Sequence, residues 1–181
     1  KFDGYRIQMR IENGEVTLKT RKGLDWTEKF SAIAKAAAKL PDAIIDGEIV
    51  ALDSKGHPDF SAMQAALSDG KTDNLVFFAF DLLFAGGEDL RPLPLLARKE
   101  RLRKLLGRSA QSSRSPIRYV EHFKADGEQM LASARKSGLE GIISKQADAP
   151  YRPGRGGSWL KVKSRPGHEV VIGGWKTTCG K

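Results

Sequence analysis

The stretch that decides the fold class is "LVFFAFDLLF", residues 75–84. It is apolar on both faces of a strand except at Asp81, and a run of this kind is typical of a central strand that is covered on both sides. A buried carboxylate is costly unless it is paired, so Asp81 stands out within this run. The stretch therefore predicts a sheet with this segment near its middle.

Strands and helices surround this segment without strict alternation along the chain. On its N-terminal side we expect a hairpin of residues 4–11 and 15–20, a helix over 27–40 with Thr27 as its N-cap, a strand over 43–52 and a short helix over 59–67. On its C-terminal side we expect a helix over 95–106, a polar loop over 107–116, a strand near 117–122, a helix near 127–137, and strands over 140–145, 159–163 and 169–175. This order predicts an α+β fold with mainly antiparallel sheets flanked by helices.

Composition narrows the class of protein further. The chain has 181 residues, of which 40% are hydrophobic, which is enough for the core of a domain. Its longest apolar stretches are too short and too interrupted to span a bilayer, so we expect no membrane partner. A single cysteine, Cys179, rules out an internal disulfide framework and a zinc cluster built on cysteines. A working metal would therefore be a hard cation on carboxylates.

The net charge of +9 is concentrated at the two ends of the chain. Residues 1–40 contain nine Lys and Arg against five Asp and Glu, and residues 145–181 contain eight against two. A solvated basic surface is the simpler interpretation of this pattern, and a polyanionic partner is the more specific one.

Four polar groups of residues lie on predicted strands or at their ends, namely "KFDGYR" (1–6), "IIDGEIV" (44–50), "EGIISK" (140–145) and "WLKVK" (159–163). Because side chains alternate along a strand, Asp46 and Glu48 share one face, and so do Lys161 and Lys163. Each pair taken alone is more often an ordinary polar strand face. Taken together, carboxylates that can hold Mg²⁺, lysines that can neutralise a phosphate and one further lysine as a nucleophile indicate nucleotidyl transfer onto an amine.

The same four groups, together with "FAFDLL" at 78–83, resemble the signature motifs of the covalent nucleotidyltransferases in their usual order. This family contains ATP-dependent DNA ligases, RNA ligases and mRNA capping enzymes. The stretches "TRKGLDWTEKF", "DLRPLPLLARKERL" and "PYRPGRGGSWLKVK" are most similar to the ligase domain of bacterial DNA ligase D. One departure is Lys22, where that pattern often has asparagine.

The resemblance implies a role for each matching residue. Lys1 is the nucleophile that becomes lysyl-AMP, and Phe80 stacks on adenine. The remaining nucleotide contacts fall on Arg6, Arg21, Glu48, Lys145, Lys161 and Lys163. Glu48 and Glu140 are the expected ligands of Mg²⁺ or Mn²⁺, and Arg21, Arg152 and Arg155 are the expected DNA contacts.

The resemblance also implies a domain plan and a reaction. Residues 1–165 are expected to form a nucleotidyltransferase (ATP-grasp-like) domain that is trimmed at its N-terminus. Residues 166–181 would be a linker and the first strand of a truncated OB-fold. The expected activity is that of an ATP-dependent DNA ligase, which moves AMP from Lys1 to a DNA 5′-phosphate and seals the nick during non-homologous end joining.

The expected setting is the bacterial cytoplasm, at the nucleoid. The expected partners are nicked or broken double-stranded DNA, polymerase and nuclease modules, and an end-binding protein. The alternatives are an RNA ligase, an mRNA capping enzyme and a non-catalytic nucleic-acid-binding module.

Overall fold

The structure is a computed structural model and describes residues 1–154 and 157–164. Its main feature is a six-stranded sheet in the order β2-β1-β3-β4-β5, with β6 paired to β4 on the same edge as β5. The strands are β1 (Tyr5–Glu12), β2 (Glu15–Thr20), β3 (Ala43–Val50), β4 (Val76–Ala85), β5 (Glu88–Asp89) and β6 (Ile117–Tyr119). All pairs are antiparallel except β4 with β6. The prediction of an α+β fold with a central strand at residues 75–84 is confirmed.

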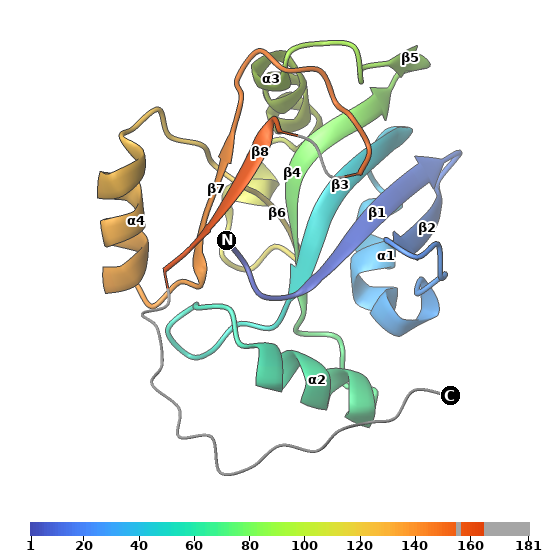
Figure 1. Cartoon of the computed structure of the whole chain (residues 1–181). Coiled ribbons are helices and arrows are strands. Elements are labelled where there is room, and N and C mark those ends of the chain that lie inside the picture. Colours follow the sequence, from blue (N-terminus) through green and yellow to red (C-terminus); the bar gives the residue numbers. More distant parts are fainter. Residues whose placement is uncertain (155–156, 165–181) are drawn as a thin grey trace, which may run out of the picture.

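Helices flank this sheet, and a second, smaller sheet lies beside it (Figure 1). The helices are α1 (Ser31–Ala37), α2 (Phe60–Asp69), α3 (Leu95–Leu106) and α4 (Gly127–Lys136), with short 3₁₀ turns η1 (Glu28–Phe30) and η2 (Arg108–Gln111). Among the described residues, the small sheet is formed by β7 (Gly141–Lys145) and β8 (Trp159–Lys163), and α4 lies on its outer side. No helix within the described part of the chain has the length and apolar character needed to cross a membrane.

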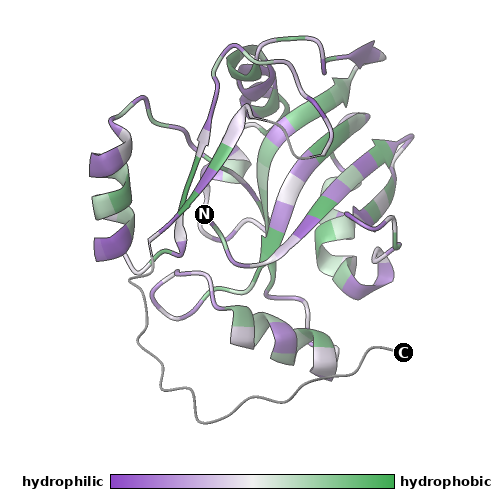
Figure 2. Cartoon of the chain, in the orientation of Figure 1, coloured by the Kyte–Doolittle hydropathy of each residue, from purple (hydrophilic) through white to green (hydrophobic). Residues whose placement is uncertain are grey.

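The core lies between the main sheet and the helices that cover it. Strand β4 is apolar over much of its length, as Figure 2 shows. The fully buried apolar side chains come from β1 to β4, from the α1 region and from α3, and include Ile7, Met9, Leu18, Phe30, Ile33, Ile45, Ile49, Phe77, Leu82 and Leu102. The polar side chains of the sequence motifs lie on the opposite face of the main sheet.

The first hairpin agrees with its prediction. Its two strands join through Asn13 and Gly14, which both have positive φ (52° and 80°). This pair of conformations belongs to the two-residue turn that matches the twist of antiparallel strands, and Asn-Gly is its preferred sequence. The turn sets the register in which Arg10 lies opposite Thr17.

The predicted helix over 27–40 is wrong at both ends. The chain forms η1 and then a helix of only seven residues, α1. Thr27 does not cap it, because its hydroxyl accepts a hydrogen bond from the Leu18 amide (2.9 Å) and donates one to Asp25 (2.6 Å). The Thr27 hydroxyl therefore bonds to β2 and does not form the helix cap that the sequence pattern predicts.

Three smaller differences occur downstream. The predicted polar loop over 107–116 contains η2, and β5 was not predicted because two residues carry no periodicity. Strand β6 ends at Tyr119 rather than near 122, and it is parallel to β4. The predicted strand over 169–175 and the predicted OB-fold segment over 166–181 lie outside the described residues.

Candidate active site

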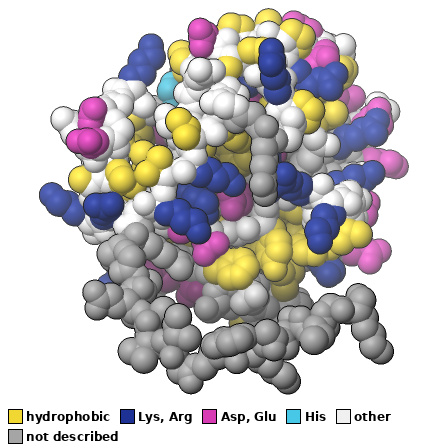
Figure 3. All heavy atoms as spheres, in the orientation of Figure 1, with side chains coloured by type: hydrophobic (Ala, Val, Ile, Leu, Met, Phe, Trp, Pro, Cys, Tyr) yellow, Lys and Arg dark blue, Asp and Glu magenta, His cyan; other side chains and the backbone are white. Residues whose placement is uncertain are grey.

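The four polar sequence groups meet between the main sheet and the β7–β8 hairpin. In the described residues, β7 and β8 form ladder hydrogen bonds only with each other. The N-terminal segment bridges the two sheets, because the backbone nitrogen of Lys1 donates to the carbonyl oxygen of Gly141 at 2.6 Å. In Figure 3, Lys and Arg side chains gather near the middle of this face, with acidic side chains among them.

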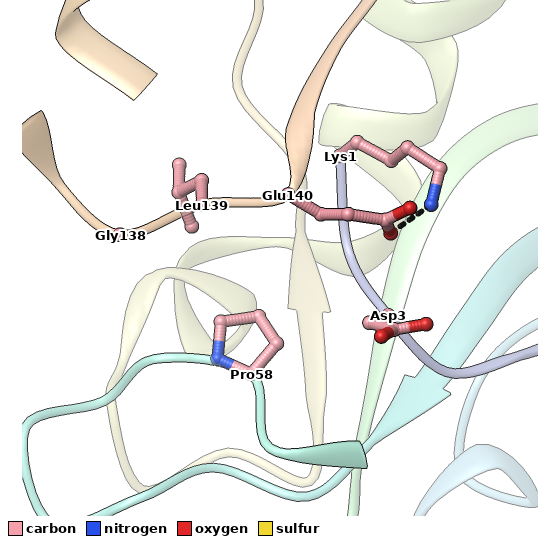
Figure 4. A pocket seen from close by; sticks show the side chains of 6 residues that line it. All are labelled: Lys1, Asp3, Pro58, Gly138, Leu139 and Glu140. Carbon is pink, nitrogen blue, oxygen red and sulfur yellow. Dashed lines mark hydrogen bonds and ion pairs between the residues drawn. The ribbon is translucent and has the colours of Figure 1, made fainter. Parts of the chain in front are cut away.

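Lys1 is held by a carboxylate at one end of this space. Its Nζ forms an ion pair with Glu140, and the two side chains are only 15% and 13% exposed. Figure 4 shows both groups pointing toward each other beside a small cavity. The cavity is also lined by Asp3, Pro58, Gly138 and Leu139. The amine is therefore fixed in position yet reachable from solvent.

Glu48 lies on β3, next to Lys1. Its Oε1 accepts a hydrogen bond from the Gly4 amide at 3.1 Å, and its register partner on β1 is Arg6. Burial raises the pKa of Glu48, and the charges of Lys1 and Lys161 act against that rise. Glu48, Lys1 and Lys161 thus form one electrostatic group.

Arg6 is oriented by Asp46. The guanidinium donates from Nε to Oδ1 (3.0 Å) and from Nη2 to Oδ2 of this carboxylate, which is 3% exposed. The hydroxyl of Tyr151 donates to the same Oδ2 at 3.4 Å. The hydrogen bond to Asp46 raises the pKa of Arg6, so this side chain remains a cation. Two-point pairing of this kind fixes the guanidinium plane as well as its charge.

Phe80 reaches the site through a β-bulge. Asp46 pairs with Asp81 and Gly47 with Ala79, so Phe80 is the extra residue on β4. A bulge bends the strand and re-aims a side chain. As a result, the half-buried ring of Phe80 faces the hairpin and meets Trp159 edge-on, with 5.9 Å between ring centroids.

Lys145 covers these two rings. Its Nζ lies 4.3 Å from the centroid of Phe80 and 3.7 Å from that of Trp159, and the Arg6 guanidinium is 5.3 Å from the Trp159 centroid. We call Phe80, Trp159, Lys145 and Arg6 the aromatic cluster. Glu140 precedes β7 and Lys145 ends it, so at ~3.3 Å per residue their backbones lie roughly 16 Å apart. The site therefore has a lysine–carboxylate end and an aromatic end.

The remaining predicted residues are exposed. Lys161 and Lys163 share one face of β8, and the charge of Lys161 acts on Glu48. Arg21 follows β2, and Arg152 lies in the loop between β7 and β8; neither forms an ion pair with another residue in the described ranges. Arg155 lies outside the described residues.

Comparison with known proteins decides the family. The family model described as "ATP dependent DNA ligase domain" matches residues 1–163. The chain belongs to the ATP-dependent DNA ligase domain family. This confirms the resemblance that the sequence motifs indicated.

Curated relatives of this ligase domain include end-joining proteins. It is 43% identical to the multifunctional non-homologous end joining protein LigD of Pseudomonas aeruginosa, over 99% of this chain and 21% of that protein. It is 40% identical to the LigD protein of Mycobacterium tuberculosis, over 99% of this chain and 23% of that protein. The chain thus spans about a fifth of the length of these relatives.

Solved structures agree with this assignment. The mycobacterial DNA ligase D complexed with ATP and MES matches with a TM-score of 0.77 at 35% identity, over 90% of this chain and 52% of that one. The ligase domain from M. tuberculosis LigD matches with a TM-score of 0.75 at 36% identity, over the same shares. The fold expected from the resemblance is therefore confirmed.

Sequence reasoning gave no role to three residues of this ligase domain's site. Asp46 was grouped with Glu48 on one strand face, and its position beside Arg6 follows from that alternation once β1 and β3 are paired. Trp159 was quoted within "WLKVK", but no periodicity distinguishes it from a core residue. Tyr151 lies in an irregular loop, where only the tertiary structure shows its contact with Asp46.

The buried Lys99 and the half-buried Lys145 predict a pH dependence of stability. Burial lowers the pKa of Lys145 to about 8 and that of Lys99 also to about 8. Unfolded lysine titrates near 10.4, so the unfolded chain binds more protons between pH 8 and 10.4, and stability rises with pH in this window. In the Lys145→Met variant we expect the free energy of unfolding to increase by ~1–3 kcal/mol less over this pH range than in the unaltered chain. The increase that remains would come from Lys99.

The measurement is urea unfolding between pH 7 and 10, with the exposed Lys104→Met as control. Equal pH profiles for Lys145→Met and the unaltered chain would show that Lys145 is not desolvated in the folded state.

Proposed function

We propose that this domain adenylylates itself on Lys1 with ATP and passes the AMP to DNA in order to seal nicks and breaks. The observation that carries the proposal is the placement of Lys1, whose amine is fixed by Glu140 beside Glu48 and Lys161 in a member of the DNA ligase domain family. A positioned amine beside a small cavity, with the charge of Lys161 close by, suits attack on a phosphate.

The reaction proceeds in three displacements at phosphorus. Lys1 Nζ, having lost a proton, bonds to the α-phosphorus of ATP, and the bond to pyrophosphate breaks. A DNA 5′-phosphate oxygen then takes the AMP, and the phosphorus–nitrogen bond breaks. Finally a 3′-hydroxyl loses its proton and attacks the 5′-phosphate, which forms the phosphodiester and releases AMP.

The two ends of the site suggest how the nucleotide lies. Adenine would stack on Phe80 in place of Lys145, which lies over that ring in this structure, and Arg6 with Glu48 can contact the sugar. Lys161 and Lys163 extend along β8 and can neutralise the phosphates, with Lys145 approaching from the opposite end of β7. The low exposure of Lys1 and Glu140 limits water around the reacting amine.

Two carboxylates, Glu48 and Glu140, are the residues that would hold a divalent cation. Within the described ranges no group of three or more Asp, Glu, His or Cys side chains comes together. One or two carboxylates suit Mg²⁺ or Mn²⁺, since Mg²⁺ keeps water and phosphate oxygens as its other ligands. A bound cation would neutralise phosphate charge during the transfer.

The test uses the protein with α-labelled ATP and Mg²⁺. We expect a labelled covalent adduct that disappears when nicked DNA is added, together with sealed product. An adduct formed from GTP would indicate a capping enzyme, and a preference for nicked RNA would indicate an RNA ligase. DNA binding without any adduct would reduce the domain to a nucleic-acid-binding module.

The wider role of the protein rests on the names of its relatives. Because LigD proteins are named as multifunctional end-joining proteins, we propose the same repair role at the bacterial nucleoid. Polymerase and nuclease modules and an end-binding protein would be the partners in that role.

Phe80→Ala should weaken ATP binding by ~1–3 kcal/mol, the range for stacking of a base on an aromatic side chain. Phe80 is only half-buried, so we expect little loss of stability. Phe84→Ala is the matched control, because Phe84 is a half-buried phenylalanine near the C-terminal end of the same strand. Nucleotide titration and thermal unfolding separate the two effects, and an unchanged affinity for ATP would remove Phe80 from the base site.

DNA binding should be independent of sequence and should weaken steeply with salt, because Lys and Arg contacts release counterions from the phosphates. Arg152→Ala should reduce the slope of log affinity against log salt by ~1. The control is Arg114→Ala, another exposed arginine. Fluorescence anisotropy over a range of KCl measures both slopes, and identical slopes would exclude Arg152 from the DNA contact.

A further inference from the structure

The buried carboxylate next to Phe80 has a specific partner. Asp81 is fully buried and Arg98, on α3, is 1% exposed. Arg98 donates from Nε to Oδ1 (2.8 Å) and from Nη2 to Oδ2 (3.0 Å) of Asp81. This ion pair therefore fixes α3 against the strand position adjacent to the bulged Phe80.

The third nitrogen of Arg98, Nη1, contacts backbone carbonyl groups and not Asp81. Nη1 donates to the carbonyl oxygens of Leu93 and Ala149, the latter at 3.2 Å. Ala149 belongs to the loop that connects β7 with β8. One buried side chain thus contacts both the strand of Phe80 and the loop that joins Lys145 to Trp159.

Backbone hydrogen bonds fasten the same loop nearby. The Leu96 amide donates to the carbonyl oxygen of Ala147 (3.1 Å), and the Tyr151 amide donates to that of Arg91 (2.8 Å). The Tyr151 hydroxyl then reaches Asp46. In the described residues, β7 and β8 form no backbone ladder with the main sheet. These contacts therefore determine the distance between the β7–β8 loop and the main sheet.

We propose that Arg98 is a positioning residue for the nucleotide: it fixes the position of Phe80 on one sheet relative to Trp159 and Lys145 on the other. The inference rests on the proposed function, in which the base of ATP stacks on Phe80. Arg98 touches neither the nucleotide nor Lys1, and it acts through Asp81 and the β7–β8 loop. The planar fork of arginine is required, because a lysine ammonium is a point charge that cannot hold Asp81 at two points while contacting Ala149.

Arg98→Lys tests this role through the ATP dependence of lysyl-AMP formation. The reacting amine is held at the opposite end of β7, so we expect the KM for ATP to rise ~10-fold while the maximal rate stays within ~3-fold, the signature of lost nucleotide binding. Arg101→Lys is the control, because Arg101 lies on the same helix in an exposed ion pair with Glu88. A lower yield of adduct at every ATP concentration with an unchanged KM would mean that the ion pair only supports folding, and would overturn the proposal.

Hydrogen exchange gives a second test of the same variant. Hydrogen exchange at the Leu96 and Tyr151 amides should accelerate ~10-fold or more in Arg98→Lys, while exchange in β1 and β3 stays unchanged. This readout needs no activity, so it separates a failure of this inference from a failure of the proposed function, in which the unaltered protein forms no adduct. Unchanged exchange at both amides would overturn the proposal.

Tyr151→Phe serves if Arg98→Lys does not fold, because it removes only the hydroxyl that joins the loop to Asp46. We expect a KM increase of ~3-fold with the same maximal rate, since a single long hydrogen bond of 3.4 Å is lost. An unchanged KM in this variant would show that the loop does not position Phe80 and Trp159 for the nucleotide, and would overturn the proposal.

Discussion

Lys1→Arg abolishes transfer of label from α-labelled ATP to the protein, a loss on the order of 10³-fold or more, as expected when a nucleophile is removed. Arginine keeps the positive charge and can still pair with Glu140, but its guanidinium does not deprotonate in proteins and so cannot attack phosphorus. The fold is retained, because Lys1 lies between the two sheets and outside the hydrophobic core. Gel detection of the adduct and thermal unfolding measure the two outcomes.

The exposed Lys35→Arg, on α1, is the matched control and keeps full activity. A labelled adduct of normal yield on the Lys1→Arg protein would place the nucleophile elsewhere. Peptide mapping would then identify the residue that carries AMP.

Gly4→Ala lowers the rate of lysyl-AMP formation by ~10²-fold, the cost of misplacing a reacting group by about 1 Å. A Cβ at Gly4 would lie 2.3 Å from the carbonyl oxygen of Ile49 and 2.6 Å from Cγ1 of Val50. Ile49 is fixed in the ladder between β3 and β4, so the N-terminal segment must move instead. That movement carries Lys1 away from Glu140 and breaks the hydrogen bond from the Gly4 amide to Glu48.

The same crowding should cost ~1–3 kcal/mol of stability, the usual range for overpacking. Gly127→Ala is the control, because nothing lies within 4 Å of a Cβ there and the residue opens α4. Single-turnover adenylylation and urea unfolding measure the two effects. A Gly4→Ala protein with the normal rate would show that the close approach of β3 does not position the nucleophile.

Strong local patterns accounted for much of the fold. The apolar run at 75–84 became the central strand β4, because a segment without a polar face must be covered on both sides. Asn13-Gly14 specified the first hairpin through its turn conformation. The helix over 27–40 failed because Thr27 bonds to a strand nine residues earlier in the chain, a contact that no local pattern contains.

The motifs alone pointed to the family, since their residue types suit the chemistry of phosphate, metal and amine and their order resembles that of the family. The sequence by itself thus determined the fold class, the family and the set of candidate residues. Only the tertiary structure decided which of them meet. It joined Lys1 to Glu140, 139 positions away along the chain, and gave buried Asp81 its partner in Arg98.

The tertiary structure also divided the site into two ends, with Lys145 on the rings of Phe80 and Trp159 and away from Glu140. The physical reason is that hydrogen bonds between distant segments produce the bulge at Phe80 and fix the position of the β7–β8 hairpin relative to the main sheet. Such contacts depend on register and packing, and the local alternation of residues along a strand does not specify either.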